Sequence, residues 1–143
     1  MLIGQYQHTI DNKKRLALPA KFRGEMGEKV IVTRGIEGCL VVYPEKEWAA
    51  IAERLANLTI TQPEARSFVR MILAGAMEIT LDKLGRILIP DYLKKYAGLD
   101  KKVVICGLVN RLEIWDSEKW ENYNKKSEKG VDQIVSKLGN FGI

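Results

Sequence analysis

The sequence predicts an α+β fold in which one structural unit occurs twice in tandem. The motif Asp11-Asn12-Lys13-Lys14-Arg15 has a counterpart 71 positions later in Asp82-Lys83-Leu84-Gly85-Arg86. Each motif is followed by an apolar stretch that ends in a proline, Pro19 or Pro90, and a glycine follows eight residues after each proline. Because these features recur in the same order, we expect two equivalent repeats related by a pseudo-twofold axis, with a mostly β core and flanking helices.

Each repeat is predicted to begin with a β-hairpin. Residues 5–10 alternate between polar and apolar side chains, as in a half-buried strand, and residues 15–18 form the returning strand. Between them, Asp and Asn favour a turn because their side chains bond to nearby backbone groups. In the second copy, residues 78–81 and 86–89 flank the turn, where Gly85 can supply a positive φ.

A short helix, two strands and a longer helix complete each repeat. Pro19 and Pro90 suit the first position of a helix, and the glycines that follow suit its end. Residues 30–32 and 103–105 are β-branched runs typical of buried strands, and residues 40–43 and 112–115 form a further strand. With one extra residue after Gly98, Ile31-Val32 aligns with Val103-Val104. Pro44 and Asp116-Ser117 mark the starts of the longer helices.

The domain organisation follows from this alignment of the copies. We expect a first repeat over residues 5–57, a connecting helix over 58–76, a second repeat over 77–127 and a C-terminal tail over 128–143. Repeats of about 60 residues are marginally stable alone, so the two should share a core.

Positive charge is concentrated in the two equivalent segments. The chain has a net charge of +5 and an isoelectric point of about 9.2. Residues 11–34 carry +4 and residues 82–102 carry +3, so the remainder carries −2. Such a distribution raises the potential that a polyanion experiences near both turns.

Several function classes find no support in the sequence. No catalytic triad, phosphate-binding glycine loop or set of metal ligands is recognisable, so we expect no enzyme, cofactor, metal site or small-molecule substrate. Cys39 and Cys106 lie in apolar runs and are expected to be buried, reduced thiols. There is neither an apolar run long enough for a membrane span nor a signal pattern, so the cytoplasm is the expected location.

The repeated Asp-x-x-x-Arg turn is the candidate binding site. Asp11 and Asp82 can fix their loops and orient Arg15 and Arg86, whose planar guanidinium groups match phosphate oxygens or guanine O6 and N7. Phosphates are expected to be held by the lysines of the turns, Lys13, Lys14 and Lys83. A second tier of candidates lies on the short helices and comprises Lys21, Arg23, Lys94 and Lys95.

These motifs, with the start Met-Leu-Ile-Gly-Gln-Tyr, resemble the MraZ family over residues 1 to about 127. The resemblance implies two tandem AbrB-like, swapped-hairpin DNA-binding repeats in one chain, with Arg15 and Arg86 at the family's motif arginines. It implies a nucleoid-associated repressor of the division and cell-wall gene cluster, including its own gene. It also implies binding to short direct repeats of double-stranded DNA by a ring-shaped homo-oligomer, an octamer or dodecamer. Lys14 departs from the usual turn glycine, which Gly85 retains.

Two alternatives belong to other classes of protein. The turns could serve only the assembly of an oligomeric protein-interaction scaffold, although their basic charge argues against it. A small-ligand enzyme is disfavoured by the missing nucleophile and metal ligands. Salt-dependent retention on DNA distinguishes both from a DNA-binding protein.

Overall fold

The computed structural model describes residues 1–58, 60–140 and 142. The first half of the chain forms β1 (Leu2–Thr9), β2 (Arg15–Ala17), α1 (Ala20–Met26), β3 (Lys29–Arg34), β4 (Leu40–Pro44) and α2 (Glu45–Ala56). After α3 (Pro63–Val69) and a π-helical turn (Arg70–Ala74), the order recurs as β5 (Met77–Thr80), β6 (Arg86–Leu88), α4 (Asp91–Tyr96), β7 (Lys102–Val109), β8 (Leu112–Asp116) and α5 (Ser117–Lys129). The chain continues into α6 (Val131–Leu138). The predicted α+β fold of two tandem repeats is therefore confirmed.

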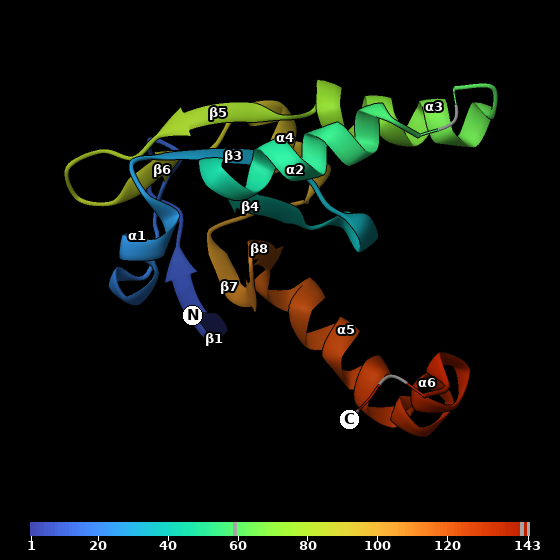
Figure 1. Ribbon diagram of the computed structural model, residues 1–143. Coiled ribbons are helices and arrows are strands. Elements are labelled where there is room, and N and C mark those ends of the chain that lie inside the picture. Colours follow the sequence, from blue (N-terminus) through green and yellow to red (C-terminus); the bar gives the residue numbers. More distant parts are fainter. Residues whose placement is uncertain (59, 141, 143) are drawn as a thin grey trace.

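The strands form two sheets. The larger has six strands in the order β1-β7-β8-β4-β3-β5, and the smaller is a two-stranded ribbon of β2 and β6. All the pairings in both sheets are antiparallel. Helix α2 contacts β3 and β4 of the large sheet, α3 lies beyond the end of the sheet, and α5 leads away from the sheet and carries α6 (Figure 1).

The predicted local hairpins are wrong in their pairing. The strands that flank each turn do not form a ladder with each other: β1 pairs with β7, β5 pairs with β3, and β2 pairs with β6 of the other copy. A local hairpin would be limited by the three-residue strands β2 and β6, whereas β1 finds eight partners along β7. The partners are thus exchanged between copies, which is what the term swapped hairpin describes.

The ribbon register has the pseudo-twofold symmetry expected of the repeats. Arg15 is opposite Leu88, and the 71-residue shift turns this pair into Arg86 opposite Ala17, which is also observed. The backbone N–H of Leu18 donates to Gly85 O at 3.0 Å, and its counterpart Ile89 donates to Lys14 O at 2.9 Å. Each turn is therefore held by the other repeat.

The alignment of the third strand needs a correction of one residue. The partners of β3 and β7 place Val30 at the position of Val103, so that Ile31 corresponds to Val104. The second copy has two extra residues after Gly98, not one, and its next loop is one residue shorter, which restores the 72-residue offset at β8. Both strands are buried whichever residue is aligned, so the burial pattern alone could not reveal the shift.

One hydrophobic core serves both repeats. Leu16 and Ile87 from the inner face of the ribbon pack into it and are fully buried. Equivalent residues from the two copies supply most of the remainder: Leu18 and Ile89, Phe22 and Leu93, Met26 and Ala97, Leu40 and Leu112, Val42 and Ile114. Because neither ribbon strand has a partner within its own repeat, neither half could close this core alone.

Candidate nucleic-acid interface

The two Asp-x-x-x-Arg turns have the same hydrogen bonds. In the first, Asp11 Oδ1 accepts from the backbone N–H groups of Lys13 and Arg15, each at 2.9 Å. In the second, Asp82 Oδ1 accepts from Leu84 and Arg86 at the same distances. The side chain of each aspartate therefore fixes its own loop, as the sequence predicts.

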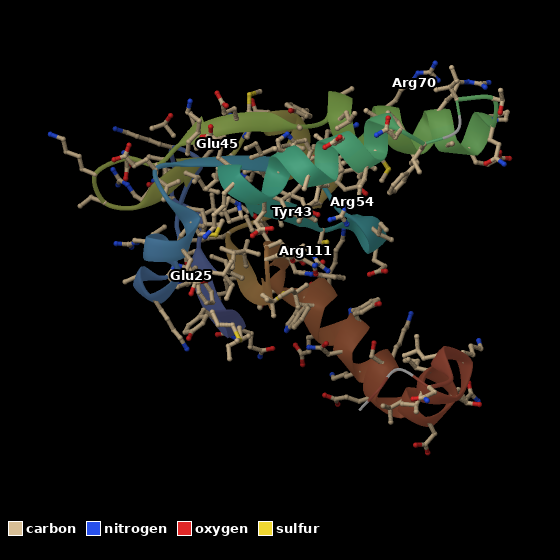
Figure 2. All side chains as sticks on the ribbon, in the orientation of Figure 1. Glu25, Tyr43, Glu45, Arg54, Arg70 and Arg111 are labelled. Carbon is tan, nitrogen blue, oxygen red and sulfur yellow. The ribbon has the colours of Figure 1, made fainter. Side chains whose placement is uncertain are left out.

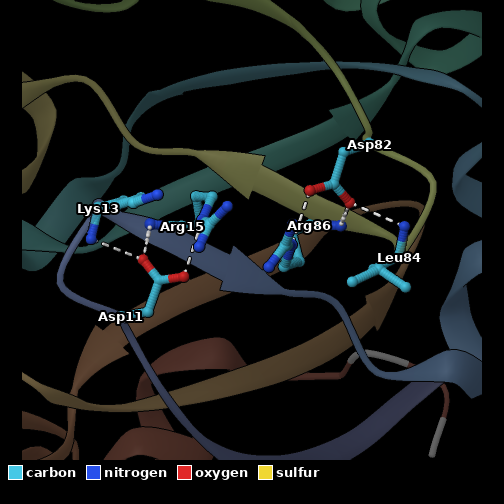
Figure 3. Close-up of polar contacts among 6 residues, drawn as sticks. All are labelled: Asp11, Lys13, Arg15, Asp82, Leu84 and Arg86. Atoms are coloured by element: carbon cyan, nitrogen blue, oxygen red, sulfur yellow. Dashed lines mark hydrogen bonds and ion pairs between the residues drawn. The ribbon is translucent and has the colours of Figure 1, made fainter.

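The same aspartates orient the arginine side chains. Arg15 Nε donates to Asp11 Oδ2 at 2.8 Å, and Arg86 Nε donates to Asp82 Oδ2 at 2.6 Å. Both guanidinium groups lie between the two carboxylates, side by side (Figure 3). These bonds use Nε and do not engage the Nη amino groups at the tip of each side chain.

These interactions also affect protonation. The hydrogen bonds that Asp11 accepts from the backbone and side chain of Arg15 hold the pKa of its carboxyl below the ordinary value. The backbone and side chain of Arg86 lower the pKa of Asp82 in the same way. Both carboxylates are therefore charged at neutral pH and keep the arginines in place.

The ribbon brings the two arginines onto one face. Because side chains alternate along a strand, Arg15 and Ala17 of β2 lie on the face opposite to the buried Leu16. Arg86 and Leu88 of β6 lie on that same outward face. Arg15 and Arg86 are diagonal neighbours in the ladder, a geometry that places Cα atoms about 7–8 Å apart and Cβ atoms somewhat closer.

Lys14 adopts the left-handed conformation that glycine favours. Its φ is 63°, and the φ of Gly85 at the equivalent position is 73°. The turn therefore has the same backbone geometry in both copies, although a non-glycine residue in this region is strained. The Lys14 side chain forms an ion pair with Asp91 at the start of α4, which partly neutralises its charge.

The predicted lysines are exposed but unevenly distributed. Lys13 and Lys14 flank the first turn, whereas only Lys83 is in the second, where Leu84 is 61% exposed. The turn between β5 and β6 lies at the end of the molecule opposite Arg70 (Figure 2). The basic turns and the helical end are therefore separate surfaces.

The sequence did not predict the exposure of Leu88 on the ribbon or the contact that Arg23 makes with the second turn. Leu88 is 57% exposed on the outward face of the ribbon, and its alternation with Ile87 was the signal that could have placed it there. Arg23 of α1 donates from Nε to Leu18 O at 2.9 Å and covers Gly85 of the second turn. No local pattern in the sequence reports this contact, because it joins the two repeats.

Other reactive groups do not form a site. Cys39 and Cys106 are buried free thiols, as predicted, and burial raises the pKa of Cys39 to about 12 and that of Cys106 to about 11. In the part of the chain that the structure describes, His, Cys, Asp and Glu side chains nowhere cluster as metal ligands. None of the helices described there has the length and apolar character needed to cross a membrane.

The fold and the paired turns define a tandem-repeat α+β protein that presents two oriented arginines on a single ribbon. The family described as "MraZ protein, putative antitoxin-like" matches this chain twice, over residues 1–71 and 72–138. The chain belongs to the MraZ family, as its sequence motifs predicted.

The similarity to curated relatives extends over nearly the full length of the chain. The chain is 48% identical over 143 residues to the transcriptional regulator MraZ of Caldanaerobacter subterraneus subsp. tengcongensis, with all of both chains covered. It is 48% identical over 141 residues to that of Carboxydothermus hydrogenoformans, with 99% of each covered, and 47% identical over 143 residues to that of Clostridium beijerinckii, with both fully covered. The family is thus one of transcriptional regulators, a non-enzymatic class of protein.

Proposed function

We propose that this chain is a sequence-specific DNA-binding transcriptional regulator that reads DNA with the β2–β6 ribbon. The observation that carries the proposal is the pair Arg15 and Arg86, diagonal on one face and each held through Nε by its aspartate. The major groove of B-DNA admits a two-stranded ribbon, and a guanidinium group can donate two hydrogen bonds to guanine O6 and N7. Because the aspartates orient the arginines before DNA arrives, less conformational entropy is lost on binding.

The remaining residues of the turns divide the other tasks between them. Lys13, Lys14 and Lys83 contact phosphates, which provides affinity but no sequence information. Asp11 and Asp82 act indirectly, by shaping the loops and orienting the arginines. The ribbon therefore combines two base-reading side chains with a rim of cations.

The same proposal includes a ring-shaped homo-oligomer, an octamer or dodecamer. In support, apolar side chains beyond the sheet are left exposed by this chain: Val131 and Leu138 on α6, and Ile60 in the turn before α3. A ring of identical head-to-tail contacts would align the ribbons of successive subunits. Short direct repeats in DNA would then be bound together, and their weak individual affinities would combine through effective concentration.

The regulatory targets are part of the proposal and rest on the family resemblance. We propose repression of the division and cell-wall gene cluster, including this protein's own gene, by a nucleoid-associated oligomer. The names of the curated relatives support transcriptional regulation, and the target cluster rests on the family resemblance.

Footprinting on the DNA upstream of this protein's own gene tests the proposal. Protection of short repeats at regular spacing is expected, and it should weaken as salt rises because phosphate contacts release counterions. Light scattering on the same sample should give several times the 16.2 kDa of one chain. Protection that is uniform along the duplex would count against sequence-specific reading, and a mass near that of one chain would count against the ring.

A protein-interaction scaffold is the second candidate. It is favoured by Leu84 and Leu88, which are apolar and exposed beside the arginines. A scaffold would bind neither operator nor scrambled DNA, so retention of both duplexes at low salt separates the two functions.

A further inference from the structure

The two turns differ in the residue at their left-handed position. In the first turn, Lys14 occupies that position and carries the charge on its own side chain. In the second turn the position is Gly85, which has no side chain. A pseudo-symmetric DNA contact would therefore lack one cation at the second turn unless another residue supplied it.

Arg23 occupies the space that a side chain at position 85 would need. A Cβ built on Gly85 would lie 2.3 Å from Arg23 Nε and 2.6 Å from its Cζ. Arg23 Nε donates to Leu18 O at 2.9 Å, while the N–H of Leu18 donates to Gly85 O at 3.0 Å. The backbone of Leu18 thus links the guanidinium group of Arg23, in the first repeat, to the turn of the second repeat.

The arrangement has no equivalent at the first turn. The 71-residue shift turns Arg23 into Lys94, and the place of Gly85 is taken by Lys14 itself. Lys14 is paired with Asp91, whose counterpart in the first repeat is Ala20. Among the ion pairs between described residues, Arg23 has no acidic partner, so its charge is not neutralised there.

We propose that Arg23 is a phosphate-binding residue of the second turn, where it supplies the cation that Lys14 supplies to the first. Its Nε is committed to Leu18 O, which fixes the plane of the guanidinium group. The Nη amino groups remain to meet a phosphate oxygen, the ligand for which a planar fork is suited. This proposal rests on the proposed DNA-binding function and adds a residue to that site.

The test compares two variants that separate charge from hydrogen bonding. Arg23→Gln retains an N–H donor for Leu18 O but is neutral, whereas Arg23→Lys retains the charge. Binding to operator and scrambled duplexes is measured across a range of salt concentrations. We expect Arg23→Gln to lower the slope of log affinity against log salt by about 0.9 for each subunit bound, and Arg23→Lys to retain the wild-type slope. Near physiological salt, that change corresponds to about five-fold weaker binding per subunit.

Lys94→Gln is the matched control, because Lys94 is the counterpart of Arg23 in the second repeat. It should change the slope by less than Arg23→Gln does. A rescue variant combines Gly85→Lys with Arg23→Ala, because alanine leaves free the space that the new side chain needs. It places a lysine in the geometry that Lys14 already adopts and should recover the slope that Arg23→Ala alone loses. Melting temperature and oligomer mass show that each variant is folded.

The outcomes are distinct. A wild-type slope in folded Arg23→Gln overturns the proposal while leaving DNA binding by the ribbon intact. Equal losses in Arg23→Gln and Lys94→Gln also overturn it, because the effect would then be that of net charge alone. If the wild-type protein shows no salt-dependent DNA binding, the proposed function and this inference fail together.

Discussion

The first and second turns share a backbone but differ in their side chains. Both have an aspartate that accepts two backbone N–H bonds and an arginine held through Nε. The first turn is rich in lysine, whereas the second carries the exposed Leu84 and is covered by Arg23 from the other repeat. The two copies therefore share the geometry that orients the arginine, and they differ in the charged side chains around it.

The largest effect should come from the arginines, where the two turns are most alike. Arg15→Ala and Arg86→Ala should each weaken operator binding by about 1–3 kcal/mol, because a fork onto guanine is lost. The loss recurs in every subunit, so it should multiply across the sites engaged. Gel retardation with operator and scrambled duplexes at two salt concentrations measures it.

Arg15→Lys and Arg86→Lys are the controls, since lysine retains the charge but not the fork. They should bind scrambled DNA almost as well as the wild type and lose preference for the operator. If folded, oligomeric alanine variants bind operator as the wild type does, the turns serve architecture and not recognition.

A second difference concerns the glycine. Gly85→Ala should destabilise the fold by about 1–2 kcal/mol from its left-handed φ alone, and by more because Arg23 must move. Lys14→Ala should cost far less, because a side chain already occupies that conformation. Urea unfolding of both variants checks this, and equal midpoints would contradict the asymmetry between the turns.

The lysine content of the turns gives a smaller, graded effect. Lys13→Ala should lower the salt slope by roughly one unit and weaken all DNA sequences alike. Leu84→Lys places a lysine at the equivalent position and should raise the slope by a similar amount. Salt titrations with scrambled DNA are sufficient, and an unchanged slope in both variants would remove these positions from the DNA contact.

Lys14→Gly should separate stability from binding. Glycine relieves the strain of the left-handed conformation, so the fold should gain at most about 1 kcal/mol, reduced by the greater freedom of glycine in the unfolded chain. DNA binding should become weaker and less salt-dependent, because one cation is lost. Paired unfolding and retardation measurements test this, and a fold less stable than the wild type would show that the ion pair with Asp91 outweighs the strain.

Protonation of Asp11 and Asp82 is expected to have the smallest effect on stability, because it occurs only in acid. Since the folded state lowers the pKa values of Asp11 and Asp82, their stabilising contribution is present above the unfolded pKa of about 3.9. It is lost as the pH falls from there through the folded pKa. Urea midpoints should therefore decline in acid more steeply for the wild type than for Asp11→Asn or Asp82→Asn. The two variants should behave alike, and unequal curves would mean that the turns are held differently.

The sequence by itself determined the elements and the chemistry of the turns. The Asp-x-x-x-Arg spacing predicted a loop fixed by its own carboxylate, and both turns have that hydrogen bonding. Proline and glycine at fixed offsets predicted the short helices. These features depend on neighbouring residues, whose interactions are local and can be read from spacing.

Tertiary structure alone decided which strands pair and which residues from the two repeats meet. The exchange of β2 and β6, the position of Arg15 beside Arg86 and the contact of Arg23 with Gly85 all join residues more than 60 positions apart. A three-residue strand has little pairing preference of its own, so its partner is chosen by the burial of the shared core. The local motif thus specifies an oriented arginine, and only the folded chain places two of them on one ribbon.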